Sequence, residues 1–222
     1  PPREEISFRE HVIDTIVSDI APAYPQWRKD NTTPREMFEI LGKAGLLGFR
    51  EIGGKFARTP WMQSIHLYRE IAAFSGGLAI ATFVQGSLGN EAFYLFGTGA
   101  QKMEYLSLGL RGKRLFAFAN TEPSAGSDAS MIRTQAKDMG DHYIVNGSKA
   151  YITNGDFADE IIFTAVTDPE AERPHKGISM FIVPGDAKGL TRTRMKKYGW
   201  KESHLCTLQF DNVVIPKENM LG

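Results

Sequence analysis

Along the first half of the chain, apolar residues recur every three or four positions, which is the period of an amphipathic helix. Phe8, Val12, Ile16 and Ile20 form one such series. Signals for a helix start, in which Ser or Thr precedes Pro, Glu or Gln, occur at Ser7, Thr33, Thr59 and Thr98. The most apolar segment, residues 78–96, is expected to be the buried central helix of a bundle. Residues 53–58 are expected to form a loop.

From residue 114 onwards the apolar residues alternate with polar or aromatic ones, which is the period of a β-strand. The segments with this pattern are residues 114–120, 131–138, 142–145, 149–153, 161–166, 178–183, 191–195 and 205–214. Asn146-Gly147 between two of them predicts a two-residue hairpin. Short strands with frequent turns indicate an antiparallel barrel or sandwich. The predicted fold class is therefore α+β, with an N-terminal all-α helical bundle domain over 1–113 and an antiparallel β-barrel or sandwich domain over 114–222.

Composition excludes several classes of protein. The 222 residues carry 26 basic and 26 acidic side chains, so the chain lacks the excess of basic residues typical of a nucleic-acid binder or a polybasic membrane anchor. Its single cysteine, Cys206, excludes an internal disulfide and a cysteine-based zinc site, and is expected to be a packing residue. Polar residues interrupt segment 78–96, so we expect a buried helix there and not a membrane span. The N-terminal residues have no apolar signal segment, and we expect a soluble protein of a reducing compartment.

The motifs of general enzymology point to a ligand-holding loop and to no catalytic group. Residues 119–129, ANTEPSAGSDA, join a predicted strand to a run of small residues whose backbone N–H groups could meet an anion. Asp128 could fix this loop by accepting local N–H bonds, and an ordinary polar turn remains the alternative. Dinucleotide-binding, P-loop, zinc-protease and nucleophile-elbow motifs are absent. The scattered histidines predict no metal site; they are His11, His66, His142, His175 and His204.

Two longer strings carry a family resemblance. Residues 121–128, TEPSAGSD, and residues 146–155, NGSKAYITNG, together resemble the acyl-CoA dehydrogenase family, and their spacing also fits. Shorter similarities at 46–48, 87–89, 96–102, 177–179 and 210–216 extend the resemblance over nearly the whole chain. The resemblance implies an N-terminal helical domain, a middle β domain and a C-terminal four-helix bundle, with FAD between the last two.

The resemblance also implies roles for individual residues. Those expected to bind FAD are Phe118, Asn120, Thr121, Gly126, Ser127, Tyr151, Ile152 and Thr153. Thr121 and Thr153 would bond polar edges of the isoalloxazine ring, and the amides of Gly126 and Ser127 would meet the pyrophosphate. Tyr151 departs from the Trp that is frequent in the family but keeps an aromatic surface. Those expected to bind the acyl-CoA substrate are Ser127 and Thr167 for the CoA part, and Ile80, Ala81, Phe83 and Val84 for the acyl tail.

The activity implied is α,β-dehydrogenation of an acyl-CoA thioester in fatty acid β-oxidation. A glutamate takes the α-proton, the β-hydride passes to the flavin, and the electrons go to an electron-transfer flavoprotein. The family's base lies in the C-terminal bundle, so we assign no catalytic residue here and expect Glu122 to fix its loop. The full-length enzyme would be a homodimer or homotetramer in the bacterial cytoplasm or the mitochondrial matrix.

Three interpretations of the chain remain open at this point. The first is a fragment of a full-length dehydrogenase that lacks the domain with the base and is inactive alone. The second is a short subunit, non-catalytic alone, whose bundle comes from a partner chain. The third is a relative with the same fold, either an acyl-CoA oxidase, a flavin monooxygenase or a non-catalytic binding module. The length of the acyl chain cannot be predicted from the residues.

Overall fold

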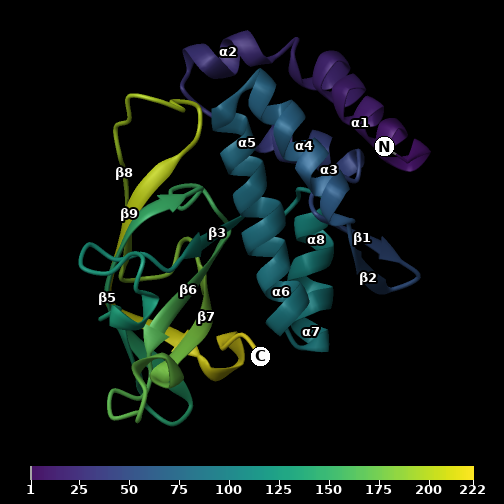
Figure 1. Ribbon diagram of the computed structural model, residues 1–222. Coiled ribbons are helices and arrows are strands. Elements are labelled where there is room, and N and C mark those ends of the chain that lie inside the picture. Colours follow the sequence, from purple (N-terminus) through teal and green to yellow (C-terminus); the bar gives the residue numbers. More distant parts are fainter. Residues whose placement is uncertain (1) are drawn as a thin grey trace.

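A computed structural model describes residues 2–222 and places a helical region beside a curled β-sheet (Figure 1). The helices are α1 (Arg3–Thr15), α2 (Tyr24–Lys29), α3 (Arg35–Lys43), α4 (Trp61–Phe74), α5 (Gly76–Phe83), α6 (Asn90–Phe96), α7 (Gly99–Gln101) and α8 (Ser107–Leu110). Three π-helical segments continue them: η1 (Ile16–Ile20), η2 (Val84–Gly89) and η3 (Lys102–Leu106). Within residues 2–222 no helix is long and apolar enough to cross a membrane.

The helix starts follow the capping chemistry of the sequence at Thr98 but not at Ser7. Thr98 and Gln101 form a capping box, in which each side chain accepts a backbone N–H of the other residue. Ser7 lies inside α1, which begins at Arg3 after Pro2, so the predicted start there is wrong. Proline fixes its own φ near the helical value and can open a helix without a side-chain cap.

The central helix runs through α5, η2 and α6 without a break. The Ser75 hydroxyl accepts the Leu78 N–H at 3.3 Å and caps its start. The π-helical segment η2 contains the buried Gln85, whose side chain donates to the carbonyls of Gly109 and Arg114 and accepts the Phe116 N–H. These bonds attach the middle of the helix to the first strand of the large sheet.

The sequence predicts a loop over residues 53–58, but residues 49–58 form a β-hairpin. Strand β1 (Phe49–Ile52) pairs antiparallel with β2 (Lys55–Arg58). Gly53 and Gly54 both have positive φ, as a tight two-residue hairpin turn requires. The apolar alternation is too short and too exposed in these strands to stand out in the sequence.

The large sheet has seven strands. They are β3 (Phe116–Ala119), β4 (Gln135–Asp138), β5 (His142–Thr153), β6 (Glu160–Val166), β7 (Ile178–Pro184), β8 (Leu190–Arg194) and β9 (Leu205–Pro216). The order is β3-β6-β4-β5-β9-β8, with β7 on β6. Three 3₁₀ turns accompany it: η4 (Ala129–Met131), η5 (Pro174–Gly177) and η6 (Lys217–Asn219).

The sheet corrects two predictions. It is mixed and not antiparallel, because β3 and β4 both run parallel to β6. Asn146-Gly147 is not a hairpin turn, since both residues lie inside the 12-residue strand β5. A register shift between Val145 and Gly147 marks a bulge there. Gly147 is required because a Cβ would lie 2.6 Å from the Cα of Thr134.

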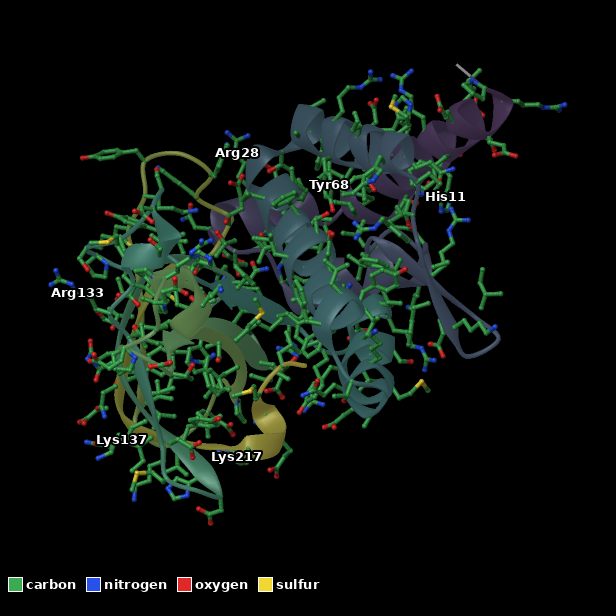
Figure 2. The ribbon with its side chains drawn as sticks, turned by 60° about the horizontal axis from the view of Figure 1, so that its bottom comes forward. His11, Arg28, Tyr68, Arg133, Lys137 and Lys217 are labelled. Atoms are coloured by element: carbon green, nitrogen blue, oxygen red, sulfur yellow. The ribbon has the colours of Figure 1, made fainter. Side chains whose placement is uncertain are left out.

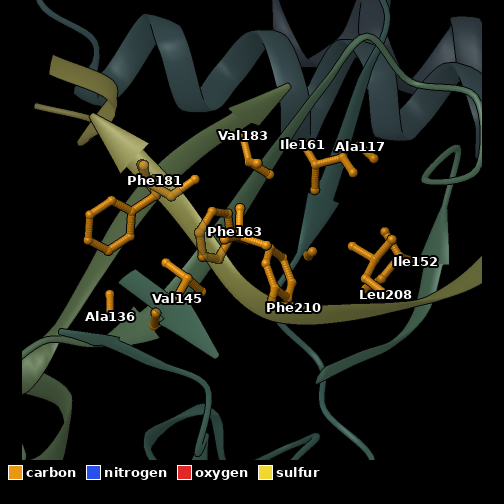
Figure 3. Packing of buried hydrophobic residues seen from close by; sticks show 14 of the residues in the cluster. Ala117, Ala136, Val145, Ile152, Ile161, Phe163, Phe181, Val183, Leu208 and Phe210 are labelled. Atoms are coloured by element: carbon orange, nitrogen blue, oxygen red, sulfur yellow. The ribbon is translucent and has the colours of Figure 1, made fainter. Parts of the chain in front are cut away.

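Buried apolar side chains form separate clusters in the sheet, in the helices and between the two. The inside of the sheet is filled by residues such as Phe163, Phe181 and Phe210 (Figure 3). A further cluster joins Phe93 of α6 to Phe116 of β3 and Ile162 of β6. The helical region and the sheet therefore share an apolar contact at β3 and β6. Cys206 is buried in the cluster inside the sheet, as predicted.

Candidate functional site

The two long motifs of the sequence meet at the end of β3. Residues 120–122 leave β3 beside the second half of β5, and the Ala150 N–H donates to the Thr121 carbonyl at 2.9 Å. The parallel pairing of β3 with β6 fixes the direction in which residues 120–122 leave the sheet. The structure thus brings the segment 118–122 and the segment 149–153 side by side.

Glu122 fixes the turn that follows. Its N–H donates to the Ala125 carbonyl at 2.8 Å, and the Ala125 N–H donates back at 3.2 Å. The buried carboxylate accepts the backbone N–H groups of Arg133 at 2.7 Å and Thr134 at 3.0 Å. Burial acts to raise the pKa of Glu122, but hydrogen bonds from Lys149, Thr134 and Arg133 outweigh it and lower this pKa. Glu122 therefore stays ionised and holds its loop in place, as predicted.

Asp128 fixes the far end of the same loop. Its carboxylate accepts the Ser130 N–H at 3.0 Å and the Ser130 hydroxyl at 2.6 Å. These bonds lower the pKa of Asp128. Between the two carboxylates, Gly126 and Ser127 are exposed, and a Cβ added to Gly126 would have no atom within 4 Å. The small residues thus leave open space beside an exposed backbone.

A bulge in β5 turns one aromatic side chain outward. The pairing of β5 with β9 shifts between Lys149 and Ile152, and Tyr151 in this shift has φ +60. A left-handed conformation is uncommon for an aromatic residue and often marks a functional site. Tyr151 is 63% exposed, whereas the Ile152 side chain is buried in the core of the sheet. Ile152 can therefore meet a ligand at this surface only through its main chain.

The polar residues on the two segments differ in their hydrogen bonding. Thr121 and Thr153 are half-buried, and within residues 2–222 their hydroxyls have no hydrogen-bond partner. Asn120 is different, because its side-chain oxygen accepts the Thr164 hydroxyl at 2.7 Å. Phe118 is half-buried and packs against the apolar cluster between the helices and the sheet. The surface formed by Thr121, Tyr151 and Thr153 is the candidate site.

The four helix residues expected to line an acyl tail divide into two pairs. Ile80 is half-buried and Phe83 is 37% exposed. Ala81 and Val84 are buried, so their side chains fill the protein interior. Asn154, one residue after β5, donates from its side chain to the Ala81 carbonyl at 3.1 Å. This bond attaches the strand end at Thr153 to the central helix.

Thr167 lies away from these residues, just beyond the end of β6. Its hydroxyl donates to the Gly177 carbonyl at 3.2 Å and shares a 2.9 Å hydrogen bond with the Ser179 hydroxyl. The flanking Val166 and Asp168 line a cavity of about 350 Å³. Ser130 also lines this cavity, so it lies close to the loop of residues 122–130.

Two of the larger cavities lie near α2 and the segment that joins β8 to β9. They measure about 560 and 530 Å³ and share Asn31 and Lys201 as lining residues. Figure 2 shows Arg28, which lines the first of them, and Arg133, whose backbone N–H reaches Glu122. We place the candidate site at Thr121, Tyr151 and Thr153 despite these cavities, because the two motifs meet there. Within residues 2–222 no group of three or more His, Cys, Asp or Glu side chains could hold a metal ion.

Comparison with known proteins identifies the family. The family model described as acyl-CoA dehydrogenase, N-terminal domain, matches residues 2–113, and the one described as acyl-CoA dehydrogenase, middle domain, matches residues 117–213. The chain belongs to the acyl-CoA dehydrogenase family. An acyl-CoA dehydrogenase of Bacillus subtilis is 36% identical over 99% of this chain and 58% of its own length.

Solved structures show that the fold is that of acyl-CoA dehydrogenases. The crystal structure of an acyl-CoA dehydrogenase from Geobacillus kaustophilus superposes with a TM-score of 0.91 at 31% identity, over all of this chain and 59% of that one. A glutaryl-CoA dehydrogenase from Mycobacterium smegmatis in complex with FADH2 gives 0.89 at 30% identity, over 99% of this chain and 55% of that one. The chain thus spans a little over half the length of these relatives.

Sequence reasoning missed three residues of the site. Lys149 and Thr164 lie beneath it, and Asn154 joins it to the central helix. The pattern of β5 predicts that Lys149 lies in a strand but does not show which lysine of the chain is buried. A buried ammonium needs acidic or carbonyl partners, and here these come from a distant part of the sequence.

Proposed function

We propose that this chain forms the helical and middle parts, over 1–113 and 114–222, of an FAD-dependent acyl-CoA dehydrogenase. The enzyme would remove hydrogen from the α and β carbons of an acyl-CoA thioester and transfer the electrons to an electron-transfer flavoprotein. One observation carries the proposal: residues 118–122 and 149–153 meet beside an outward-turned aromatic ring and two free threonine hydroxyls.

The residues at this surface fit FAD. An isoalloxazine ring has a flat face and a polar edge, and both need partners that are held still. Tyr151 offers an exposed aromatic face, and the hydroxyls of Thr121 and Thr153 have unused hydrogen-bonding capacity. Gly126 and Ser127 expose backbone beside open space, where a pyrophosphate could approach without a steric clash. The glutaryl-CoA dehydrogenase of similar fold holds the reduced form of this cofactor.

The residues of this chain would hold and orient the reactants. FAD, when bound, supplies the acceptor for the hydride that leaves the β-carbon of the substrate. Thr121 and Thr153 would fix the in-plane position of the ring, and Phe118, Asn120 and the main chain of Ile152 would support it from the sheet. Glu122 is not a base for the α-proton, because its buried carboxylate is bonded to Lys149, Arg133 and Thr134. We assign the proton-abstracting base to no residue of this chain.

The substrate would lie across the central helix and the loop that contains Gly126 and Ser127. Ile80 and Phe83 are accessible enough to contact an acyl tail, whereas the buried Ala81 and Val84 would support the helix behind them. Ser127 and Thr167 flank the part of the surface where the CoA group would lie. As the family resemblance implies, the complete enzyme would be a homodimer or homotetramer of the bacterial cytoplasm or the mitochondrial matrix.

Flavin binding and reduction test this proposal on the full product of the gene. The purified protein is expected to show flavin absorbance, and a saturated acyl-CoA added without oxygen is expected to bleach it. Replacing Thr121 and Thr153 by Val should weaken FAD binding at least tenfold, since each change removes one hydrogen bond of about 1 kcal/mol. Tyr198→Ala is the control, because Tyr198 is a fully exposed aromatic residue that belongs to neither motif. A wild-type protein that neither contains nor binds FAD contradicts the proposal.

A further inference from the structure

A lysine lies fully buried directly beneath the candidate flavin surface. Lys149, in β5, has no exposed surface, although lysine is among the residues least often buried. It immediately precedes the bulge that turns Tyr151 outward. A buried ammonium is unfavourable unless each of its protons has an acceptor.

All three protons of this ammonium have acceptors in the structure. Lys149 Nζ lies 2.8 Å from Glu122 Oε1, 3.1 Å from the Asn120 carbonyl oxygen and 3.4 Å from the Thr164 hydroxyl. Thr164 in turn donates to the side-chain oxygen of Asn120 at 2.7 Å. The bonds form a closed network in which each member is held by at least one other member.

The network connects two segments that lie far apart in the sequence. On one side it holds the backbone of Asn120 and the carboxylate of Glu122, which are the neighbours of Thr121 on either side. On the other side the network includes Lys149 of β5, and the N–H of the next residue, Ala150, donates to the Thr121 carbonyl. Lys149 therefore connects both neighbours of Thr121 to the strand that carries Tyr151, although Lys149 is not part of the exposed surface.

We propose that Lys149 is a positioning residue for the flavin: through Asn120 and Glu122 it sets the place of the Thr121 hydroxyl relative to the ring of Tyr151. The inference rests on the proposed function and adds to it a residue that does not itself touch the cofactor. An apolar side chain at position 149 leaves the Asn120 carbonyl without the Lys149 donor and the buried Glu122 carboxylate without its cationic partner, so residues 120–122 relax away from β5.

The test compares Lys149→Met with Lys137→Met in the full gene product. Lys137 is an exposed lysine in β4 of the same sheet, so its replacement controls for the loss of a charge (Figure 2). Three quantities are measured: the thermal midpoint of the flavin-free protein, the Kd for FAD, and the visible circular dichroism of the bound flavin. The last reports the asymmetric surroundings of the ring and does not respond to stability alone.

Lys149→Met is expected to raise the Kd for FAD at least tenfold and to change the flavin circular dichroism at a temperature where the flavin-free variant is folded. Lys137→Met is expected to leave both unchanged. If Lys149→Met does not fold, Glu122→Gln carries the test. It keeps the side-chain size and removes the charge that pairs with Lys149, together with one of the two oxygens that accept the backbone N–H groups of Arg133 and Thr134. The same changes are expected. A folded variant with wild-type Kd and dichroism overturns the positioning role alone. Absence of FAD binding by the wild type overturns the proposed function as well.

Discussion

The side-chain amide of Asn154 donates to the backbone carbonyl of Ala81 at 3.1 Å, across the boundary between β5 and the central helix. Asn154 is fully buried and has φ +64, a conformation that asparagine tolerates better than most residues. Its N–H donates to the His204 carbonyl at 3.2 Å. One residue therefore joins the strand that carries Tyr151 and Thr153 to the helix that carries Ile80 and Phe83.

Replacing Asn154 tests how much this connection stabilises the protein. Asn154→Gly keeps the left-handed backbone and removes the hydrogen bond, so the free energy of unfolding should fall by about 1–2 kcal/mol. Asn154→Ala should cost about 1 kcal/mol more, because alanine is also strained at this φ. Urea denaturation of both variants measures the two effects separately. Equal stabilities of Asn154→Gly and the wild type would show that the bond to Ala81 contributes nothing.

Ionisation of Glu160 should destabilise the folded protein as the pH rises towards neutrality. The carboxylate of this buried residue in β6 lies 2.8 Å from the Arg114 guanidinium. Burial nevertheless raises the pKa of Glu160 to about 7, and nearby negative charges such as Asp159 add to this rise. Because the ordinary pKa of a glutamate is 4.5, the folded state binds more protons than the unfolded state between pH 4.5 and about 7. The free energy of unfolding should therefore decrease over this interval, by about 3 kcal/mol at most.

Denaturation at several pH values checks this slope. Glu160→Gln should flatten the decrease between pH 5 and 7, since the amide does not ionise. Glu218→Gln replaces an exposed glutamate and should leave the slope as it is in the wild type. A Glu160→Gln protein with the wild-type pH dependence would exclude Glu160 as its source.

Replacement by alanine should destabilise the protein at Gly112 of the helical region but not at Gly99. Gly112 has φ +67, and a Cβ would lie 2.0 Å from the Phe38 carbonyl oxygen. Gly99, at the first position of α7, has no atom within 4 Å of that Cβ position. Gly112→Ala should lower the free energy of unfolding by about 3 kcal/mol or more, and Gly99→Ala should change it by less than about 0.5 kcal/mol. Similar stabilities of the two variants in thermal denaturation would contradict the close contact at Phe38.

Local chemistry could be predicted from the sequence, whereas strand partners could not. The Thr98 cap, the role of Glu122 and the burial of Cys206 each follow from a residue type and its near neighbours, and the structure confirms them. The parallel pairing of β3 with β6 depends on the path of the chain through space, which alternation does not reveal. Asn146-Gly147 has the composition of a hairpin turn, yet the long pairing of β5 with β9 uses it as a bulge. For the same reason the buried partners of Lys149 emerge only once distant segments are placed together.

Cys206 should be unreactive while the protein is folded. Its thiol is buried inside the sheet, and burial, followed by the negative charge of Asp156, raises its pKa to about 12. Because the thiolate is the reactive form, a disulfide reagent at pH 8 should not modify the native protein over the minutes in which it modifies the urea-unfolded protein. Ser124→Cys adds a thiol on the exposed loop and should react at once in the native state. Equally fast modification of native and unfolded wild-type protein would show that the sheet opens around Cys206.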